Sequence, residues 1–570
     1  MVKKRTGSTY PSRTKCNMFG CFKMRCCNCC SDIICGQWQD RWFFVKDTYF
    51  GLIRPKDGVV RNITLLDQGF EINVGMQNTG IRSGLQVHTN ARKVVVKTGS
   101  KKEAKEWAVY INKISSTTAK DFTTPNPHNS FAPLRSGSLA GWFVDGSTFM
   151  SGVADALEGA TEEIFIADWW LTPEIYMKRP ALDGDYWRLD KILLRKAIEG
   201  VKVFVLLYKE VEMAMGMNSL YTKQTLSGLH ENIKVMRRPD HARVGVYFWA
   251  HHEKLVCIDQ TYAFVGGIDI CYGRWDDNKH KLTDLGSIST TTSMANLSKI
   301  QEVGENALLS LLNQSRNILQ AATSYAENTL SPEITVTTAK ALRLNQKIPI
   351  KQIDNKNKGK ILMTRISVLE GITSEEENIN SGQNCLSPIE LSGQAKLWIG
   401  KDYINFILTS FTGLDVLYTD LVDRTKTPRM PWHDVSTVIV GAPARDASRH
   451  FIQRWNATKL EKERDNKTFH YLMPKSYDDI RINSNFLRNK VKLEKVSCQM
   501  LRSASQWSCG FINSDTVEQS IHEAYVLSIK KAEHYIYIEH QFFISMGFPD
   551  PIVKNKIANT IINRIVRAFR

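Results

Sequence analysis

Residues 251–259 are His-His-Glu-Lys-Leu-Val-Cys-Ile-Asp, and residues 266–269, at the end of the next apolar run, are Gly-Gly-Ile-Asp. This segment places His252 two residues before Lys254, with Asp259 further along the same run. A neutral imidazole is a nucleophile that works near pH 7, and a lysine ammonium supplies positive charge for phosphate oxygens. The glycine pair allows the backbone to approach a phosphate group closely. The segment therefore indicates chemistry on a phosphodiester.

The residues on both sides of this segment resemble those of a known family. Residues 247–250 are Tyr-Phe-Trp-Ala, and residues 271–277 are Cys-Tyr-Gly-Arg-Trp-Asp-Asp. Together with the H-x-K-x4-D spacing, they resemble the HKD signature of the eukaryotic phosphatidylcholine-specific phospholipases D. The resemblance implies two halves, each with one HKD motif, that meet at one phosphate group. This sequence contains one such motif.

The resemblance also implies a role for each residue of the site. His252 would attack phosphorus and form a phosphohistidine, Lys254 would hold phosphate oxygens, and Asp284 would anchor the far nitrogen of the imidazole. Asp259, counted with the catalytic motif, is expected to support local structure rather than to touch the substrate. The neighbouring His251 is expected to be structural. This chemistry needs no metal or cofactor, and the sequence shows no cluster of metal ligands.

Two further pairs of residues have competing interpretations. Trp169 and Trp170 could line a groove for lipid, or they could be core residues at the end of a strand. For His433 and Asp434 we favour a capping pair without a chemical role over catalysis. The candidate substrate-binding residues are Gly266, Gly267, Trp169 and Trp170.

The composition is that of a globular protein with several domains. The chain has 570 residues, of which 42% are hydrophobic and 23% are charged. Its 75 basic and 58 acidic residues give a formal net charge of +17, which favours an anionic partner such as a membrane surface, nucleic acid or a phosphorylated ligand. Because no run of about 18 apolar residues is present, we expect no membrane span. The first residues lack an apolar signal core, so a cytosolic location is the default expectation.

Cysteines are concentrated near the N-terminus. Seven of the 12 lie between residues 16 and 35. Their crowded spacing does not suit one tetrahedral zinc site, and a disulfide knot conflicts with the missing signal sequence. Palmitoylation suits cysteines flanked by basic residues, and it needs a second membrane signal such as a basic patch. We therefore expect lipidation at Cys26, Cys27, Cys29 and Cys30, with zinc binding and unmodified thiols as the alternatives.

After this basic, cysteine-rich segment (residues 1–35), residues 36–116 are expected to form a β-rich module. Two pairs of short β-type runs precede a helix over residues 100–114 that carries Trp107 and Ile111 on its apolar face. Such a strand meander closed by a tryptophan-bearing helix resembles a pleckstrin-homology (PH) domain. Eukaryotic phospholipases D carry a PH domain before their catalytic region.

Beyond a linker at residues 117–140, helical and strand patterns alternate over residues 141–285. This alternation predicts an α/β fold, and the resemblance makes it the first α/β/α layered half of a phospholipase D catalytic region. Residues 286–394 are rich in Ser, Thr, Asn, Lys and Gln, which predicts a long, mobile insertion.

An internal repeat predicts a partial second half over residues 395–570. The helix, strand and loop that end at Asp168 recur in a segment that runs from Ala524 through Tyr535 to Glu539. Carrying His252 forward by the same spacing places its counterpart beyond Arg570. We therefore expect a second half without its own HKD motif.

Residues 445–456 predict a helix with arginines at near-helical spacing and aromatic residues between them. In the family this segment resembles a polybasic site for phosphatidylinositol 4,5-bisphosphate, since guanidinium groups bind phosphates bidentately and clustered basic residues are attracted to anionic membranes. A solvated helix face is the alternative. The residues expected to bind the inositide are Arg445, Arg449 and Arg454.

The function predicted from these features is a phospholipase D that converts phosphatidylcholine to phosphatidic acid and choline, inactive alone in this incomplete form. The alternatives are a non-catalytic phosphoinositide-binding scaffold and another phosphodiesterase of the superfamily. We expect an anionic membrane surface as partner, with peripheral association from the cytoplasmic side, and no nucleic acid. The resemblance adds phosphatidylinositol 4,5-bisphosphate as activator and small GTPases and protein kinase C as partners.

Overall fold

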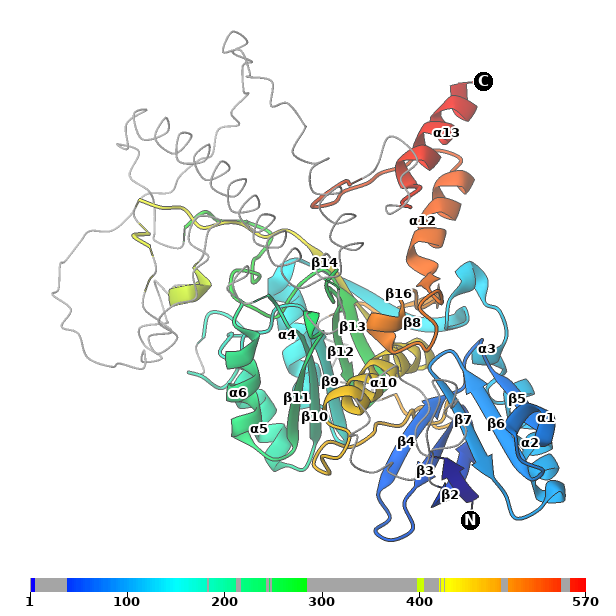
Figure 1. The fold of residues 1–570 in the computed structure, drawn as a ribbon. Coiled ribbons are helices and arrows are strands. Elements are labelled where there is room, and N and C mark those ends of the chain that lie inside the picture. Colours follow the sequence, from blue (N-terminus) through cyan, green and yellow to red (C-terminus); the bar gives the residue numbers. More distant parts are fainter. Residues whose placement is uncertain are drawn as a thin grey trace, which may run out of the picture.

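The computed structural model describes residues 2–5, 38–181, 184–211, 217–241, 246, 249–283, 397–403, 420, 422–424, 426–482, 491–544 and 554–569. The cysteines expected to carry lipid, at 26, 27, 29 and 30, lie outside the described residues, as do Asp284 and the whole of the expected insertion at 286–394. Figure 1 shows the arrangement of the elements.

The N-terminal module is a seven-stranded antiparallel sheet with a helix against it. Its strand order is β4-β3-β2-β1-β7-β6-β5. Helix α2 closes the module because its apolar face, with Ile111 fully buried, packs on a core that includes Phe50, Leu85 and Val94. Ser100 caps the helix by accepting a hydrogen bond from the Glu103 amide. The elements are β1 Val2–Arg5, β2 Trp38–Lys46, β3 Tyr49–Ile53, β4 Val60–Leu65, β5 Glu71–Val74, α1 Met76–Thr79, β6 Gly84–Thr89, β7 Arg92–Lys97 and α2 Lys101–Ser116.

The central element is an eight-stranded mixed sheet in the order β11-β10-β9-β12-β13-β14-β8-β15. Strands β9, β10 and β11 run parallel, and the remaining neighbours pair antiparallel. This sheet confirms the expected mixed α/β region. Its strands are β8 Arg135–Val144, β9 Glu163–Asp168, β10 Lys202–Tyr208, β11 Ile233–Arg238, β12 Lys254–Ile258, β13 Tyr262–Gly266, β14 Val435–Val440 and β15 Glu494–Cys498.

Helices cover both faces of this sheet (Figure 1). Because side chains alternate along a strand, Ile164 and Ile166 face the core shared with α4 and α5, while Phe165 faces α10. The Phe165 ring stacks on Phe451 of α10, with centroids 4.8 Å apart. The N-terminal module packs against α10 through Tyr49 and its neighbours. The helices are α4 Asp145–Glu158, α5 Leu189–Ile198, α6 Ser219–Leu229 and α10 Ala442–Lys462.

The sheet corrects two expectations about domain boundaries. Strand β14 follows the expected insertion, yet it pairs with β13 and β8, so one sheet joins the two expected halves. Strand β8 begins at Arg135, inside the stretch expected to be a linker. Sequence patterns missed both relationships because pairing between distant strands leaves no local signal.

The repeat near the C-terminus is only partly seen. Its helix forms α12, Ser520–Lys531, but the strand expected after it is absent, and residues 535–541 belong to no strand. In the first copy β9 is hydrogen-bonded on both sides, by β10 and β12, whereas no described strand pairs with residues 535–541. Helix α13, Ile557–Phe569, packs on α12, and the two helices extend away from the sheet (Figure 1). Within the described part, none of the helices has the length and apolar character needed to cross a membrane.

Candidate active site at one edge of the sheet

Strand ends from both parts of the chain meet at one edge of the central sheet. Strand β9 ends at Asp168, and β12 begins beside it because the two strands are antiparallel and pair Ala167 with Leu255. At the same edge β13 ends with Gly266 opposite Lys254, and β14 begins one residue from Ser436, the partner of Gly266. This arrangement brings the HKD segment, the glycine pair and residues 433–434 together.

His252 lies just before β12, at the surface, with its ring edge-on to Trp169 at a centroid distance of 5.2 Å. Lys254 is buried behind it, where Nζ donates to the His252 carbonyl at 2.9 Å and pairs with Asp269 Oδ1 at 2.9 Å. Partial burial, followed by the charge of Lys254, lowers the pKa of His252 below its ordinary value. The imidazole is therefore mainly neutral at pH 7, the form that a nucleophile requires.

Asp168 and Asp269 form a buried carboxyl pair under Lys254. Burial and the hydrogen-bonded Asp269 carboxyl raise the pKa of Asp168 well above its ordinary value. The Asp168 carboxyl also accepts hydrogen bonds from the amides of Trp169, at 2.8 Å, and Ile270, at 3.0 Å. With Asp168 protonated, the two carboxyls carry one negative charge, whereas Lys254 and Arg274, which both pair with Asp269, carry two positive charges. The edge of the sheet consequently keeps positive charge for an anion.

The glycine pair has a packing role at this edge. A Cβ on Gly266 would lie 2.2 Å from Ser436 Oγ, and one on Gly267 would lie 2.2 Å from Asp434 Oδ1. The Gly267 amide also donates to the Val435 carbonyl at 3.0 Å. The close approach that requires glycine is therefore to strand β14 and the residue before it. It does not by itself identify a phosphate cradle.

The two tryptophans after β9 have different environments. Trp169 is half-buried beside His252 and Lys254, whose Nζ lies 5.5 Å from its ring centroid. Trp170 is a buried core residue, with the Arg274 guanidinium 5.3 Å from its ring centroid. Only Trp169 is thus placed to border the candidate site. His251 is buried against the Trp507 ring.

Asp259 lies at the far end of β12, away from His252. Its carboxylate accepts hydrogen bonds at 2.8–2.9 Å from the amides of residues 161, 162 and 163 and from the Thr161 hydroxyl. Asp259 and Gln260 both have positive φ, as the tight turn between β12 and β13 requires. Asp259 is thus a hydrogen-bond acceptor for backbone amides, which agrees with its expected role in local structure. The structure corrects its grouping with the catalytic residues.

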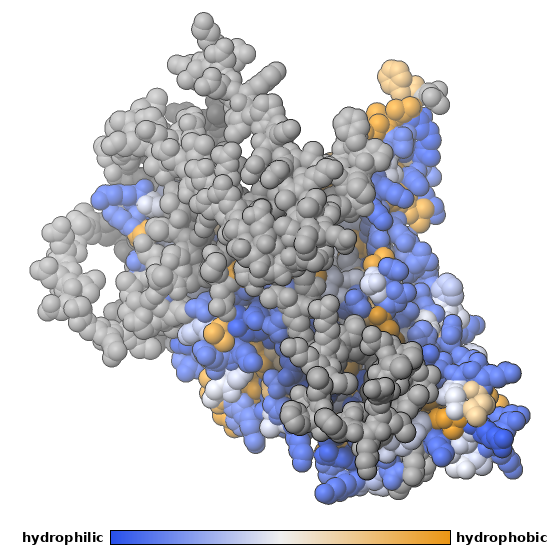
Figure 2. All heavy atoms as spheres, viewed as in Figure 1, coloured by the Kyte–Doolittle hydropathy of each residue, from blue (hydrophilic) through white to orange (hydrophobic). Residues whose placement is uncertain are grey.

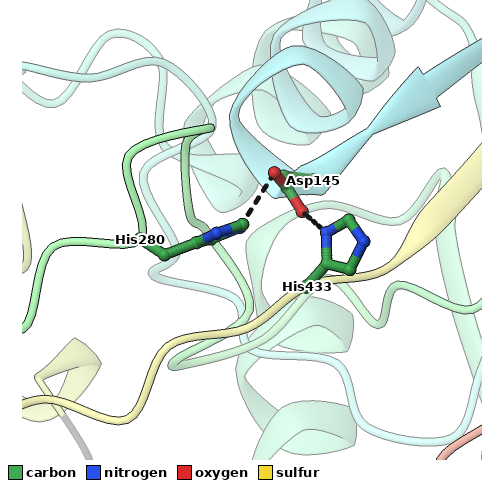
Figure 3. Close-up of side chains that lie close together, drawn as sticks. All are labelled: Asp145, His280 and His433. Carbon is green, nitrogen blue, oxygen red and sulfur yellow. Dashed lines mark hydrogen bonds and ion pairs between the residues drawn. The ribbon is translucent and has the colours of Figure 1, made fainter. Parts of the chain in front are cut away.

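A cluster that the sequence did not reveal lies beside the site. Asp145, at the start of α4, receives hydrogen bonds from His280 Nε2 at 3.0 Å and His433 Nδ1 at 2.7 Å (Figure 3). The hydrogen bond to Asp145 raises the pKa of His433. One carboxylate and two imidazoles, with donor atoms within 4.8 Å of one another, could hold a divalent cation. The three residues are far apart in sequence, so no motif spacing could predict that they lie together.

The burial of three arginines in α10 contradicts the expected inositide site. The helix forms as expected, but Arg445, Arg449 and Arg454 are each 3% exposed. Arg445 donates to the Asp479 carbonyl, and Arg449 donates to Thr48 and to the Leu66 carbonyl of the N-terminal module. Burial lowers the pKa of Arg449 to about 10 and that of Arg454 to about 9. These guanidiniums hold protein layers together and present no surface to a membrane.

Fold and site together define a layered α/β protein with a His–Lys pair at one edge of its sheet. A family model described as phospholipase D matches residues 156–303 and 416–565, and the chain therefore belongs to the phospholipase D family. The chain is 39% identical to rat phospholipase D1, a match that covers 95% of this chain and 53% of that protein. It is 38% identical to bovine phospholipase D2, over 95% of this chain and 48% of that protein. The chain thus spans about half the length of these curated relatives.

Solved structures share less with this chain. NucT from Helicobacter pylori is 18% identical to this chain, with a TM-score of 0.18. The match covers 24% of this chain and 79% of NucT.

Proposed function

We propose that this chain supplies one catalytic half of a phospholipase D that hydrolyses phosphatidylcholine to phosphatidic acid and choline. The observation that carries the proposal is the neutral, surface-exposed His252 directly beside the buried Lys254 ammonium. A nucleophile with a cation two residues away, on the same edge of the sheet, suits attack on a phosphodiester, because the cation offsets the charge that develops on the phosphate oxygens. Family membership supports the same class of reaction.

In the proposed mechanism a ring nitrogen of His252 attacks phosphorus, and the bond from phosphorus to the choline oxygen breaks. The choline oxygen takes up a proton from a second acid, and water then hydrolyses the phosphohistidine to release phosphatidic acid. The HKD motif of a second half is the source of that acid in the family pattern. This chain has one motif, so its catalytic competence depends on a second half or on a second copy.

The same proposal places the protein at an anionic membrane surface. The net charge of +17 supports this placement. Lipidation of the N-terminal cysteines belongs to the proposal as an expectation from their basic surroundings. A PH identity for the N-terminal module, activation by phosphatidylinositol 4,5-bisphosphate and contacts with small GTPases or protein kinase C belong to it as family expectations. Any inositide site must use groups other than the three buried arginines of α10 as they are placed here.

Trapping the covalent intermediate tests the proposal. The full chain and its His252→Ala variant are incubated with vesicles of phosphatidylcholine and anionic lipid, labelled at phosphorus, and are quenched in base. We expect an acid-labile protein adduct that is lost in the variant, with one choline released for each adduct formed and continued choline release if copies pair their sites. An adduct of equal yield in the variant, or vesicle binding with neither adduct nor release, would overturn the proposal; the second result would favour the scaffold.

A further inference from the structure

The residue between the two reactive side chains, Glu253, points away from them. His252 and Lys254 face the sheet edge, while the Glu253 carboxylate reaches the opposite side and meets α10. There it forms an ion pair with the Arg454 guanidinium and lies 2.8 Å from His450 Nε2. Glu253 directly precedes β12, so a contact that holds its side chain restrains the backbone that carries both neighbours.

The groups that hold Glu253 are themselves immobilised. Arg454 is 3% exposed, on the same 21-residue helix that stacks Phe451 on the sheet. The second nitrogen of His450, Nδ1, lies 3.2 Å from an Arg502 nitrogen, and Arg502 pairs with Glu518 at 2.7 Å. Packing and ion pairs thus fix the far end of the contact. A carboxylate bound to such a support cannot shift without displacing the helix.

We propose that Glu253, held by Arg454 and His450, is a positioning residue that sets the placement of the His252 imidazole and the Lys254 ammonium. The proposal deepens the function proposed above and rests on it. It also gives Arg454 a task within the protein in place of inositide binding.

Arg449 provides a matched comparison within α10. It has the same side chain and the same exposure as Arg454, but its hydrogen bonds go to Thr48 and Leu66 of the N-terminal module. Losing either guanidinium should lower the melting temperature to a similar extent. Only the loss of Arg454 should change the positions of His252 and Lys254, because only Arg454 contacts Glu253.

The test uses the full chain with Glu253→Gln, Arg454→Met and Arg449→Met, and inorganic phosphate as the probe. Phosphate affinity is measured by titration calorimetry. We expect Glu253→Gln and Arg454→Met each to weaken phosphate binding by about tenfold or more, because small displacements of positioned groups are costly. Arg449→Met should leave the affinity unchanged. In the double variant Glu253→Gln/Arg454→Met the losses should not add, since both remove one contact.

The sign of the Glu253→Gln effect separates positioning from simple electrostatics. If charge alone mattered, removing the negative charge of Glu253 would strengthen phosphate binding. If Glu253 positions the site, its replacement displaces the His252 imidazole and the Lys254 ammonium, and phosphate binding becomes weaker. Stronger or unchanged binding in Glu253→Gln, or an equal loss in Arg449→Met, overturns the proposal. If Arg454→Met fails to fold, the near-isosteric Glu253→Gln still decides the question.

A second measurement is independent of phosphate. The edge-on contact with Trp169 should shift the His252 ring proton signals in an NMR spectrum of histidine-labelled protein, assigned with His252→Ala. We expect this shift to be lost in Glu253→Gln and Arg454→Met and kept in Arg449→Met; its retention in all three overturns the proposal. If the wild-type chain does not bind phosphate, the proposed function is contradicted, while the positioning role of Glu253 is still decided by the NMR measurement.

Discussion

At the scale of single residues, Lys254 sets the electrostatic environment of His252. Its charge is among the causes that lower the pKa of His252, so Lys254→Met should raise that pKa toward the ordinary histidine value of about 6.5. Removal of Lys254 also leaves Asp269 with only its longer ion pair to Arg274, at 3.7 Å, which acts in the same direction. NMR titration of the histidine ring measures the change. Lys279→Met, at an exposed position, is the control and should leave the pKa of His252 unmoved.

Two buried aspartates should respond differently to replacement by asparagine. The raised pKa of Asp168 means that the native state holds a proton that the unfolded chain releases above about pH 4. This contribution to stability is complete in acid and is lost as pH rises through the native pKa. Asp168→Asn keeps a hydrogen-bond donor toward Asp269 without a titrating group, but its single oxygen can accept from only one of the Trp169 and Ile270 amides. Its free energy of unfolding should therefore be lower than that of the wild type by about 1–3 kcal/mol in acid, and should fall less steeply than that of the wild type as pH rises.

Asp276→Asn is the matched contrast. Asp276 and Arg429 are fully buried and paired at 2.7 Å, so the variant leaves an uncompensated guanidinium and should cost about 3–5 kcal/mol. Urea unfolding between pH 5 and pH 9 measures both variants. A loss of stability between pH 5 and pH 9 that is as steep in Asp168→Asn as in the wild type would contradict the raised pKa of Asp168.

At the scale of elements, the pairing of β13 with β14 requires a residue without a side chain at position 266. A Cβ at Gly266 would lie 2.5 Å from the Ser436 Cα, a backbone atom that cannot turn aside. Gly266→Ala should therefore separate the strands locally and cost about 1–3 kcal/mol. Gly228→Ala in α6 meets no atom within 4 Å and should stabilise by about 0.5–1 kcal/mol. Urea unfolding compares the two, and equal effects would rule out this account of the junction.

Local patterns predicted most elements because their signals are local. The apolar alternation around β9 and β12 and the arginine-bearing helix α10 are examples. The site was predictable where a motif names it, as at His252 and Lys254. Asp269, His280 and Asp145 gained their roles only through tertiary contacts. The burial of Arg449 and Arg454 was equally invisible, because a row of arginines has the same sequence whether it faces solvent or a packed neighbour.

At the scale of the whole molecule, the C-terminal helices leave apolar side chains uncovered. Ile562, Ile565 and Phe569 of α13 are exposed, the last at 94%, and apolar atoms gather at this end of the molecule (Figure 2). Contiguous exposed apolar surface favours association. We expect concentration-dependent self-association in light scattering, reduced by Ile562→Glu/Ile565→Glu. Val109→Glu on α2, an equally exposed apolar position, should not reduce it. A strictly monomeric wild type would contradict the expectation.

The entry of β14 between β13 and β8 has a consequence for biosynthesis. Residue 266 leaves the ribosome long before residue 435, and at roughly 5–20 residues per second the delay is about 10–30 s. During that interval β13 carries an unpaired edge, a surface prone to aberrant pairing. We therefore expect a chaperone that shields the nascent polypeptide to reduce its aggregation until translation delivers the missing neighbour.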